Sequence, residues 1–180
     1  IKKYGDHLPN EVAHYVEPFL GAGAMFVWAY KKNPNASFVL NDSNESIISI
    51  YECIKQDCKM FIERLDELSA AYLPLDNKNR KKFYYELRRA HAFDFAEWTK
   101  TYEAATLYFL MKTGFNGIYQ LNKNTNGRYG TPSGLLNQKD KVYDRNVLSW
   151  WHNALQNVTI LSGDWKDSVN DDDNGFFFFD

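Results

Sequence analysis

Two glycines and one aspartate form the part of this sequence best suited to chemistry. Gly21 and Gly23 end the apolar run of residues 15–20, and glycine is used where the backbone bends sharply or approaches a ligand closely. Asp42 stands roughly twenty residues later, the separation at which a second strand presents a carboxylate to a ribose. The spacing therefore predicts a cradle for a cofactor that contains a nucleoside.

Two more acidic residues follow apolar runs. Asp164 comes just after residues 158–161, and Asp180 comes after four consecutive phenylalanines. Ligands of open α/β sheets bind outside the carboxyl ends of the strands, so these acids and Asp42 are expected to converge on one site. Two of the three also have a plainer interpretation. Asp42 suits the dipole of a following helix, and Asp164 belongs to a common Gly-Asp turn.

The elements that position these groups alternate between strand and helix at both ends of the chain. Strands are expected at residues 15–20, 38–42, 158–161 and 175–180, and helices at 24–30, 44–54 and 142–156. The last strand, rich in phenylalanine, is expected to be covered on both faces. Between these segments, residues 60–112 show helical periodicity, with breaks at 74–80 and around 91–95. We therefore predict an α/β sheet with helices on both faces, formed by residues 1–56 and 142–180, and an inserted, mainly helical lobe at 57–141.

The composition limits the classes of protein. With 180 residues, 44% of them hydrophobic, the chain is long enough for one compact domain with an inserted lobe. A net charge of −2 excludes a protein that coats nucleic acid by charge alone, so any such contact needs a local basic patch. Cys53 and Cys58 lack partners at metal-ligand spacing, which predicts no metal site and a reducing setting. No apolar run approaches about eighteen residues, so no membrane span is expected.

A segment rich in Gly and Asn, residues 113–134, follows the helical stretch. Residues 118–122 and 128–131 are expected to pair as a β-hairpin around a polar tip. Six basic and two acidic residues leave a net charge of +4 over residues 112–145, which suits contact with phosphate groups. A solvated loop would show the same charge, so both interpretations stay open.

Four motifs, in this order, resemble those of the Dam-type DNA adenine methyltransferases. They are Glu17-Pro18-Phe19-Leu20-Gly21-Ala22-Gly23, Asn41-Asp42-Ser43-Asn44, Phe115-Asn116-Gly117 with Asn122 and the later Thr131-Pro132-Ser133-Gly134, and a strand that ends on Asp180. The resemblance covers nearly the whole chain. It implies a Rossmann-like methyltransferase sheet, S-adenosyl-L-methionine as cofactor, and methyl transfer to the exocyclic amine of a flipped-out adenine in double-stranded DNA. It also implies a cytoplasmic protein of a bacterial or phage-infected cell, active in DNA methylation or restriction-modification.

The same resemblance assigns roles to individual residues. Asp180 matches the first residue of the catalytic Asp-Pro-Pro-Tyr motif, whose carboxylate holds the adenine amine. The residues expected to bind the cofactor follow three of the strands: Glu17, Pro18, Phe19, Gly21, Gly23, Asp42, Ser43, Asp164 and Trp165. The residues expected to bind DNA lie on the hairpin or just before it: Lys112, Phe115, Asn116, Gly117, Gln120, Asn122, Lys123 and Arg128. Phe115 is either a wedge in the space left by the flipped base or a core residue of the hairpin.

The sequence departs from the family pattern at four points. The lysine-bearing N-terminal motif is absent, and Pro-Pro-Tyr does not follow Asp180. Residues 130–134 lack the aromatic residue that is usual before the last glycine. Gln120 stands where GATC-reading enzymes carry an arginine, and glutamine reads adenine more naturally than guanine, which predicts a target other than GATC. We expect this polypeptide to be an N-terminal portion of a longer protein, able to bind cofactor weakly but not to catalyse methyl transfer by itself.

Two other functions fit parts of the pattern. Gly21 and Gly23 with Asp42 resemble half of the fingerprint of NAD-dependent oxidoreductases, but Phe26 stands at the third glycine position, where it would crowd the helix against the strand. A DNA-binding or regulatory module that keeps the fold without the chemistry is the non-enzymatic alternative. The sequence does not set the oligomeric state.

Overall fold

The computed structural model describes residues 9, 11–134, 141–169 and 175–180. The chain forms two compact units. The first consists of Ile1–Glu52 together with Asn153–Asp180, and the second of Cys53–His152. None of the helices within the described ranges combines the length and apolarity needed to cross a membrane.

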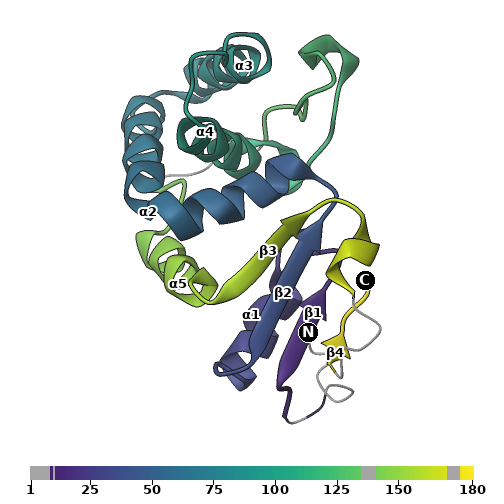
Figure 1. Ribbon diagram of the computed structural model, residues 1–180. Helices are drawn as coiled ribbons and strands as arrows, with labels where there is room; N and C mark the ends of the chain where they lie inside the picture. The colour runs from purple at the N-terminus through teal and green to yellow at the C-terminus, as the bar shows by residue number, and fades with distance from the viewer. Residues whose placement is uncertain (1–8, 10, 135–140, 170–174) are drawn as a thin grey trace. The chain divides into compact units, whose positions relative to one another are not determined.

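A parallel sheet of four strands forms the centre of the first unit. Strands β1 (His14–Glu17), β2 (Ser37–Asp42), β3 (Val158–Ser162) and β4 (Phe176–Phe177) lie in the order β3-β2-β1-β4 (Figure 1). Every pairing is parallel, so the carboxyl ends of all four strands meet at one edge. The predicted α/β fold is confirmed. The chain adds β2 and β3 on one side of β1 and then returns to its other side with β4, which makes the boundary of β1 and β4 a topological switch point.

Aromatic packing holds helix α1 (Ala24–Lys32) against this sheet (Figure 1). The rings of Phe26 and Phe38 are 5.3 Å apart, centroid to centroid. Tyr15 on β1 also packs on Phe38 and, from the other side, on Phe176. The expectation that the phenylalanine strand is covered on both faces is wrong. The side chains of β4 are half-buried and Phe179 is 51% exposed, and β4 is an edge strand that pairs only with β1 among the described strands.

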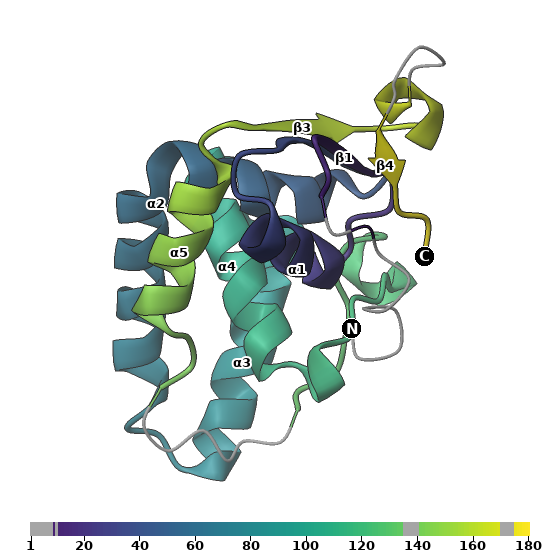
Figure 2. The same cartoon turned by 90° about the horizontal axis from the view of Figure 1, so that it is seen from below.

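Four helices build the second unit. Helix α2 (Glu45–Tyr72) begins in the first unit and continues into the second, and α3 (Asn77–Phe93), α4 (Lys100–Thr113) and α5 (Arg145–Leu155) follow. Helices α3 and α4 lie side by side (Figure 2). The two helices expected at 44–54 and 60–73 are the two parts of α2, which meet at a kink at Asp57 where the backbone leaves helical geometry. The break expected around 91–95 is the connection between α3 and α4.

The segment at 113–134, called the loop below, folds back on itself with little regular structure. Two isolated antiparallel bridges join Gly114 to Ser133 and Leu121 to Tyr129. Two 3-10 turns, η2 (Phe115–Gly117) and η3 (Lys123–Thr125), lie on either side of the expected arm at 118–122. The fold-back of the predicted hairpin is therefore present, but its arms touch through isolated bridges and are not continuous strands.

Candidate functional site

The turn after β1 depends on two glycines. Gly21 and Gly23 have φ angles of 48° and 67°, a left-handed conformation that costs other residues about 1–2 kcal/mol. Gly23 occupies the N-cap position of α1, and its amide donates to the Leu20 carbonyl at 2.8 Å. A Cβ atom built on Gly21 would meet none of the described atoms within 4 Å. The backbone at Gly21 is therefore open to close approach by a ligand.

Asp42 connects this turn to the end of β2. Its Oδ2 accepts a hydrogen bond from the Gly21 amide at 2.8 Å, and its Oδ1 accepts one from the Asn44 amide at 2.9 Å. One carboxylate thus fixes the glycine turn and also shapes the approach to α2. Each carboxylate oxygen has a further lone pair, so Asp42 can still accept from a ligand hydroxyl. Ser43, beside it, is exposed.

Asn41 is a residue that the sequence analysis missed. Its side chain is buried, and Nδ2 donates to the Pro18 carbonyl at 3.0 Å and to the Gly163 carbonyl at 3.3 Å. The Oδ1 atom has no hydrogen-bond partner among the described residues. One amide therefore ties together the segments that follow β1, β2 and β3. A polar residue inside a buried strand end was the available signal.

Glu17 is a buried carboxyl at the end of β1. Its Oε2 accepts a hydrogen bond from the Tyr15 hydroxyl at 2.9 Å. Burial raises the pKa of Glu17 to about 7, against the effect of the hydrogen bonds from Tyr15 and from the Phe26 amide, and the charge of Asp180 raises it further. Asp180 is itself exposed. The charge of Asp180 is thus felt by Glu17 at the switch point between β1 and β4.

Three exposed aromatic rings lie at the same edge of the sheet, and we call Phe19, Trp165 and Phe179 the aromatic trio. Phe179 packs against both others, with ring centroids 6.1 Å from Phe19 and 5.8 Å from Trp165. All three side chains remain 39–51% exposed, although apolar groups of this size are usually covered when they cluster. Asp164 precedes Trp165 and accepts from the Lys166 amide at 3.0 Å. Sequence reasoning found Phe19 and Trp165 but not Phe179.

Most of the residues predicted to bind DNA lie on the outer side of the loop. Six of the eight are exposed: Lys112, Phe115, Asn116, Gly117, Gln120 and Lys123. The other two are engaged within the protein. Asn122 caps the turn η3 by accepting from the Asn124 amide at 2.8 Å. Arg128 is ion-paired with Glu103 and lies over the Phe95 ring at 3.6 Å.

The comparison with known families decides the class of protein. The sequence profile of the D12 class N6 adenine-specific DNA methyltransferases matches residues 2–180. The chain belongs to this family. The sheet of the first unit, with its glycine turn after β1 and an acid after β4, is accordingly the sheet of a D12 methyltransferase, and membership of the family implies a methyl donor.

Curated relatives support the same assignment. A type II methyltransferase, M.MjaIII of Methanocaldococcus jannaschii, is 32% identical over 187 residues, covering 100% of this chain and 63% of its own length. M1.LlaDCHI of Lactococcus lactis is 27% identical, covering 96% of this chain and 57% of its own length. A DNA adenine methylase of Haemophilus influenzae is 26% identical, covering 88% and 50%. The chain thus spans between half and two thirds of the length of these relatives.

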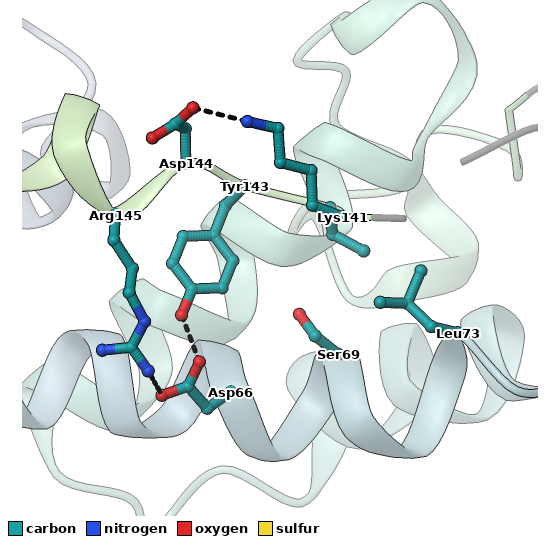
Figure 3. A pocket seen from close by; sticks show the side chains of 8 residues that line it. Asp66, Ser69, Leu73, Lys141, Tyr143, Asp144 and Arg145 are labelled. Atoms are coloured by element: carbon teal, nitrogen blue, oxygen red, sulfur yellow. Dashed lines mark hydrogen bonds and ion pairs between the residues drawn. The ribbon is translucent and has the colours of Figure 1, made fainter. Parts of the chain in front are cut away.

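A surface pocket of about 360 Å³ lies within the second unit of this D12 chain, between α2 and residues 141–145 (Figure 3). Its charges are already paired. Asp66 accepts from the Tyr143 hydroxyl and pairs with Arg145, while Lys141 pairs with Asp144 at 2.6 Å. These contacts fasten residues 141–145 to α2. Elsewhere in the described part of the chain, no group of three or more His, Cys, Asp or Glu side chains is arranged to hold a metal ion.

Proposed function

We propose that this chain is part of an enzyme that transfers the methyl group of S-adenosyl-L-methionine to the exocyclic amino nitrogen of adenine in double-stranded DNA. The observation that carries the proposal is the position of Glu17, Asp180 and the aromatic trio at the switch point of a D12 methyltransferase sheet. Ligands of open α/β sheets bind at this point. The proposal concerns the whole protein, of which the relatives' lengths suggest this chain is a portion.

The residues at this edge of the sheet fit S-adenosyl-L-methionine. The open backbone at Gly21 would admit the methionine part, and Asp42 would accept from the ribose hydroxyls. The exposed faces of the aromatic trio suit stacking on the adenine ring of the cofactor. When bound, the cofactor supplies an electrophilic methyl group on a sulfonium. The turn residues Glu17, Pro18 and Gly23 act indirectly, because their side chains or backbone are buried and shape the turn.

Asp180 would hold the amine that receives the methyl group. The nitrogen lone pair of an adenine amine is delocalised into the ring, so the amine is a weak nucleophile. A carboxylate that accepts a hydrogen bond from the amine N–H favours a geometry in which the nitrogen lone pair points at the methyl donor. Positioning of the two reacting groups supplies most of the rate gain. The target base must leave the duplex to reach such a group. The family's Pro-Pro-Tyr sequence, expected after Asp180, would complete this arrangement.

The loop would recognise the target sequence. Gln120 is exposed at the loop surface, and a glutamine pairs with the major-groove edge of adenine. We therefore propose a target other than GATC. Lys112 and Lys123, also exposed, would contact phosphates. A Gln120→Arg change in the full-length protein should move the preference at one base toward guanine, and an unchanged profile over a random duplex library would refute this assignment.

Thermal-shift measurements test the cofactor class directly. S-adenosyl-L-methionine and S-adenosylhomocysteine should each raise the unfolding temperature of this chain, and NAD should not. Stabilisation by NAD alone would overturn the proposal. The absence of any response would favour a DNA-binding or regulatory module of the same fold. The structure argues against an NAD-dependent oxidoreductase. Phe26 occupies the position of the third glycine of that fingerprint and is fully buried against the sheet.

The setting of the reaction follows the same proposal. A cytoplasmic enzyme of a bacterial or phage-infected cell would meet both its cofactor and double-stranded DNA. Cys53 and Cys58 are both in the thiol form and not in a disulfide, which agrees with a reducing compartment. Methylation of host DNA or protection within a restriction-modification system would use the same chemistry.

A further inference from the structure

We propose that Arg88 positions the recognition loop by binding the loop's backbone, and that it does not act as a contact to DNA phosphate. This inference rests on the proposed function only in naming what the loop recognises. Arg88 lies on α3, in a run of basic residues whose composition alone suggests either a solvated helix face or a DNA-binding one. The structure assigns Arg88 a different partner.

The guanidinium of Arg88 grips two consecutive carbonyl groups. Its Nη1 donates to the Gly130 carbonyl and to the Thr131 carbonyl, each at 2.9 Å. The guanidinium carbon lies over the Tyr85 ring, 4.7 Å from its centroid. The Tyr84 hydroxyl, from the same helix, donates to the Thr131 carbonyl as well, at 2.9 Å. Helix α3 thus holds the returning arm of the loop through its backbone.

Gly130 and Thr131 in turn hold the outward arm at Gln120 itself and at Ile118, two residues before it. The Gly130 amide donates to the Gln120 carbonyl at 2.7 Å. The Thr131 hydroxyl donates to the Ile118 carbonyl at 2.7 Å. Arg88 is therefore connected to the proposed base-reading position through one residue, Gly130, and two hydrogen bonds. A shift of the returning arm would move Gln120 with it.

The two arms of the loop are closely packed where they are joined. A Cβ atom on Gly130 would lie 2.1 Å from the Asn122 Cβ, so the two arms are already in contact. Thr131 is 1% exposed and cannot reach DNA. The adjacent Arg89 differs sharply, since its side chain is 73% exposed and pairs with Asp94 at 3.7 Å. Arg89 is thus the matched control for a change at Arg88.

The two roles of Arg88 predict different responses to salt. A phosphate contact contributes about one unit to the slope of log affinity against log salt, and its loss weakens binding to all sequences alike. A positioning residue leaves the slope unchanged and lowers discrimination between the target and other sequences. Arg88→Met keeps the apolar stem and removes both hydrogen bonds. Arg88→Lys keeps the charge but lacks the planar guanidinium that lies over the Tyr85 ring.

The test compares Arg88→Met, Arg88→Lys, Thr131→Val and Arg89→Met in the full-length protein. Amide hydrogen exchange at Gly130, measured without any ligand, should accelerate by about tenfold or more in the first three variants and stay unchanged in Arg89→Met. The affinity for a duplex that carries the recognition sequence, divided by the affinity for a random duplex, should fall by about tenfold in those three variants. The slope of log affinity against log salt should stay unchanged. Thr131→Val breaks the next bond along, from the Thr131 hydroxyl to the Ile118 carbonyl, without altering charge. Where Arg88→Met does not fold, Arg88→Lys provides the same measurements.

Several results would overturn the proposal. The first is a slope of log affinity against log salt that is smaller by about one in Arg88→Met, with unchanged discrimination between sequences. The second is wild-type behaviour of Arg88→Lys in both measurements. The third is unchanged amide hydrogen exchange at Gly130 in the Arg88 variants. Failure of the proposed function is distinguishable from these. If the wild-type protein binds no duplex, the DNA measurements fail for every variant, while the exchange at Gly130 still decides whether Arg88 holds the loop.

Discussion

Replacing Glu17 by glutamine should remove a pH-dependent loss of stability. Glu17 is 3% exposed, and its pKa is raised from 4.5 to about 7, chiefly because burial disfavours the charged form. Asp180 adds to the effect through its charge. Glutamine has nearly the same shape, can still accept from the Tyr15 hydroxyl, and cannot ionise. The substitution therefore isolates the cost of ionising this carboxyl inside the fold.

The sign of the effect follows from the two pKa values. Below pH 4.5 the carboxyl of Glu17 is protonated in both the folded and the unfolded chain, and ionisation costs nothing. As the pH rises from 4.5 toward 7, the unfolded chain releases its proton first, so the free energy of unfolding falls by about 1.4 kcal/mol per pH unit. Above pH 7 the loss levels off at about 3 kcal/mol, which follows from the raised pKa. The glutamine variant should gain this amount over the wild type between pH 4.5 and pH 8.

Urea unfolding followed by circular dichroism, repeated across this pH range, measures the difference between the two proteins. A Glu86→Gln variant is the control, because Glu86 is 67% exposed beside Lys82 and a surface pair of this kind is worth at most about 1 kcal/mol. The ¹³C shift of the Glu17 carboxyl provides a direct titration. Parallel stability curves for the wild type and Glu17→Gln, or a carboxyl that titrates near 4.5, would refute the reasoning.

Four further substitutions test the site and the loop. Asn41→Leu should lower the free energy of unfolding by about 2 kcal/mol in urea titrations, because it leaves two buried carbonyls without their donor, and it should weaken cofactor binding. Gly130→Ala should disrupt the loop, because its Cβ would lie 2.1 Å from the Asn122 Cβ. Gly127→Ala has open space around it and should lower the free energy of unfolding by only about 1 kcal/mol, for its φ of 73°. Thermal unfolding compares the two variants. Phe115→Ala should change stability by less than about 0.5 kcal/mol, since the ring is 48% exposed, yet it should reduce the fluorescence rise of 2-aminopurine placed at the target base.

Local patterns in the sequence were sufficient for the fold class and for the glycine turn and strand-end acid of the proposed cofactor site. The apolar runs gave the four strands, and parallel strands bring their carboxyl ends to one edge whatever the details of packing. Gly21, Gly23 and Asp42 could be found because a sharp turn and a strand-end acid require particular residue types at particular spacings. The gap between the expected helices at 44–54 and 60–73 contains the kink at Asp57. The shortness of β4 could not be found this way, since neighbouring segments decide it.

Other functional positions depend on contacts between residues that are distant along the chain. Asn41 reaches Gly163 across 122 positions, Arg88 reaches Gly130 across 42, and Arg128 reaches Glu103 across 25. An arginine in a basic segment looks the same in the sequence whether it faces DNA or holds a loop. By itself the sequence determined the strands, the glycine turn and the acids after them, because these follow from local backbone requirements. Only the tertiary structure decided which polar side chains form hydrogen bonds within the protein and which remain exposed. Burial and hydrogen-bond partners are properties of the packed chain.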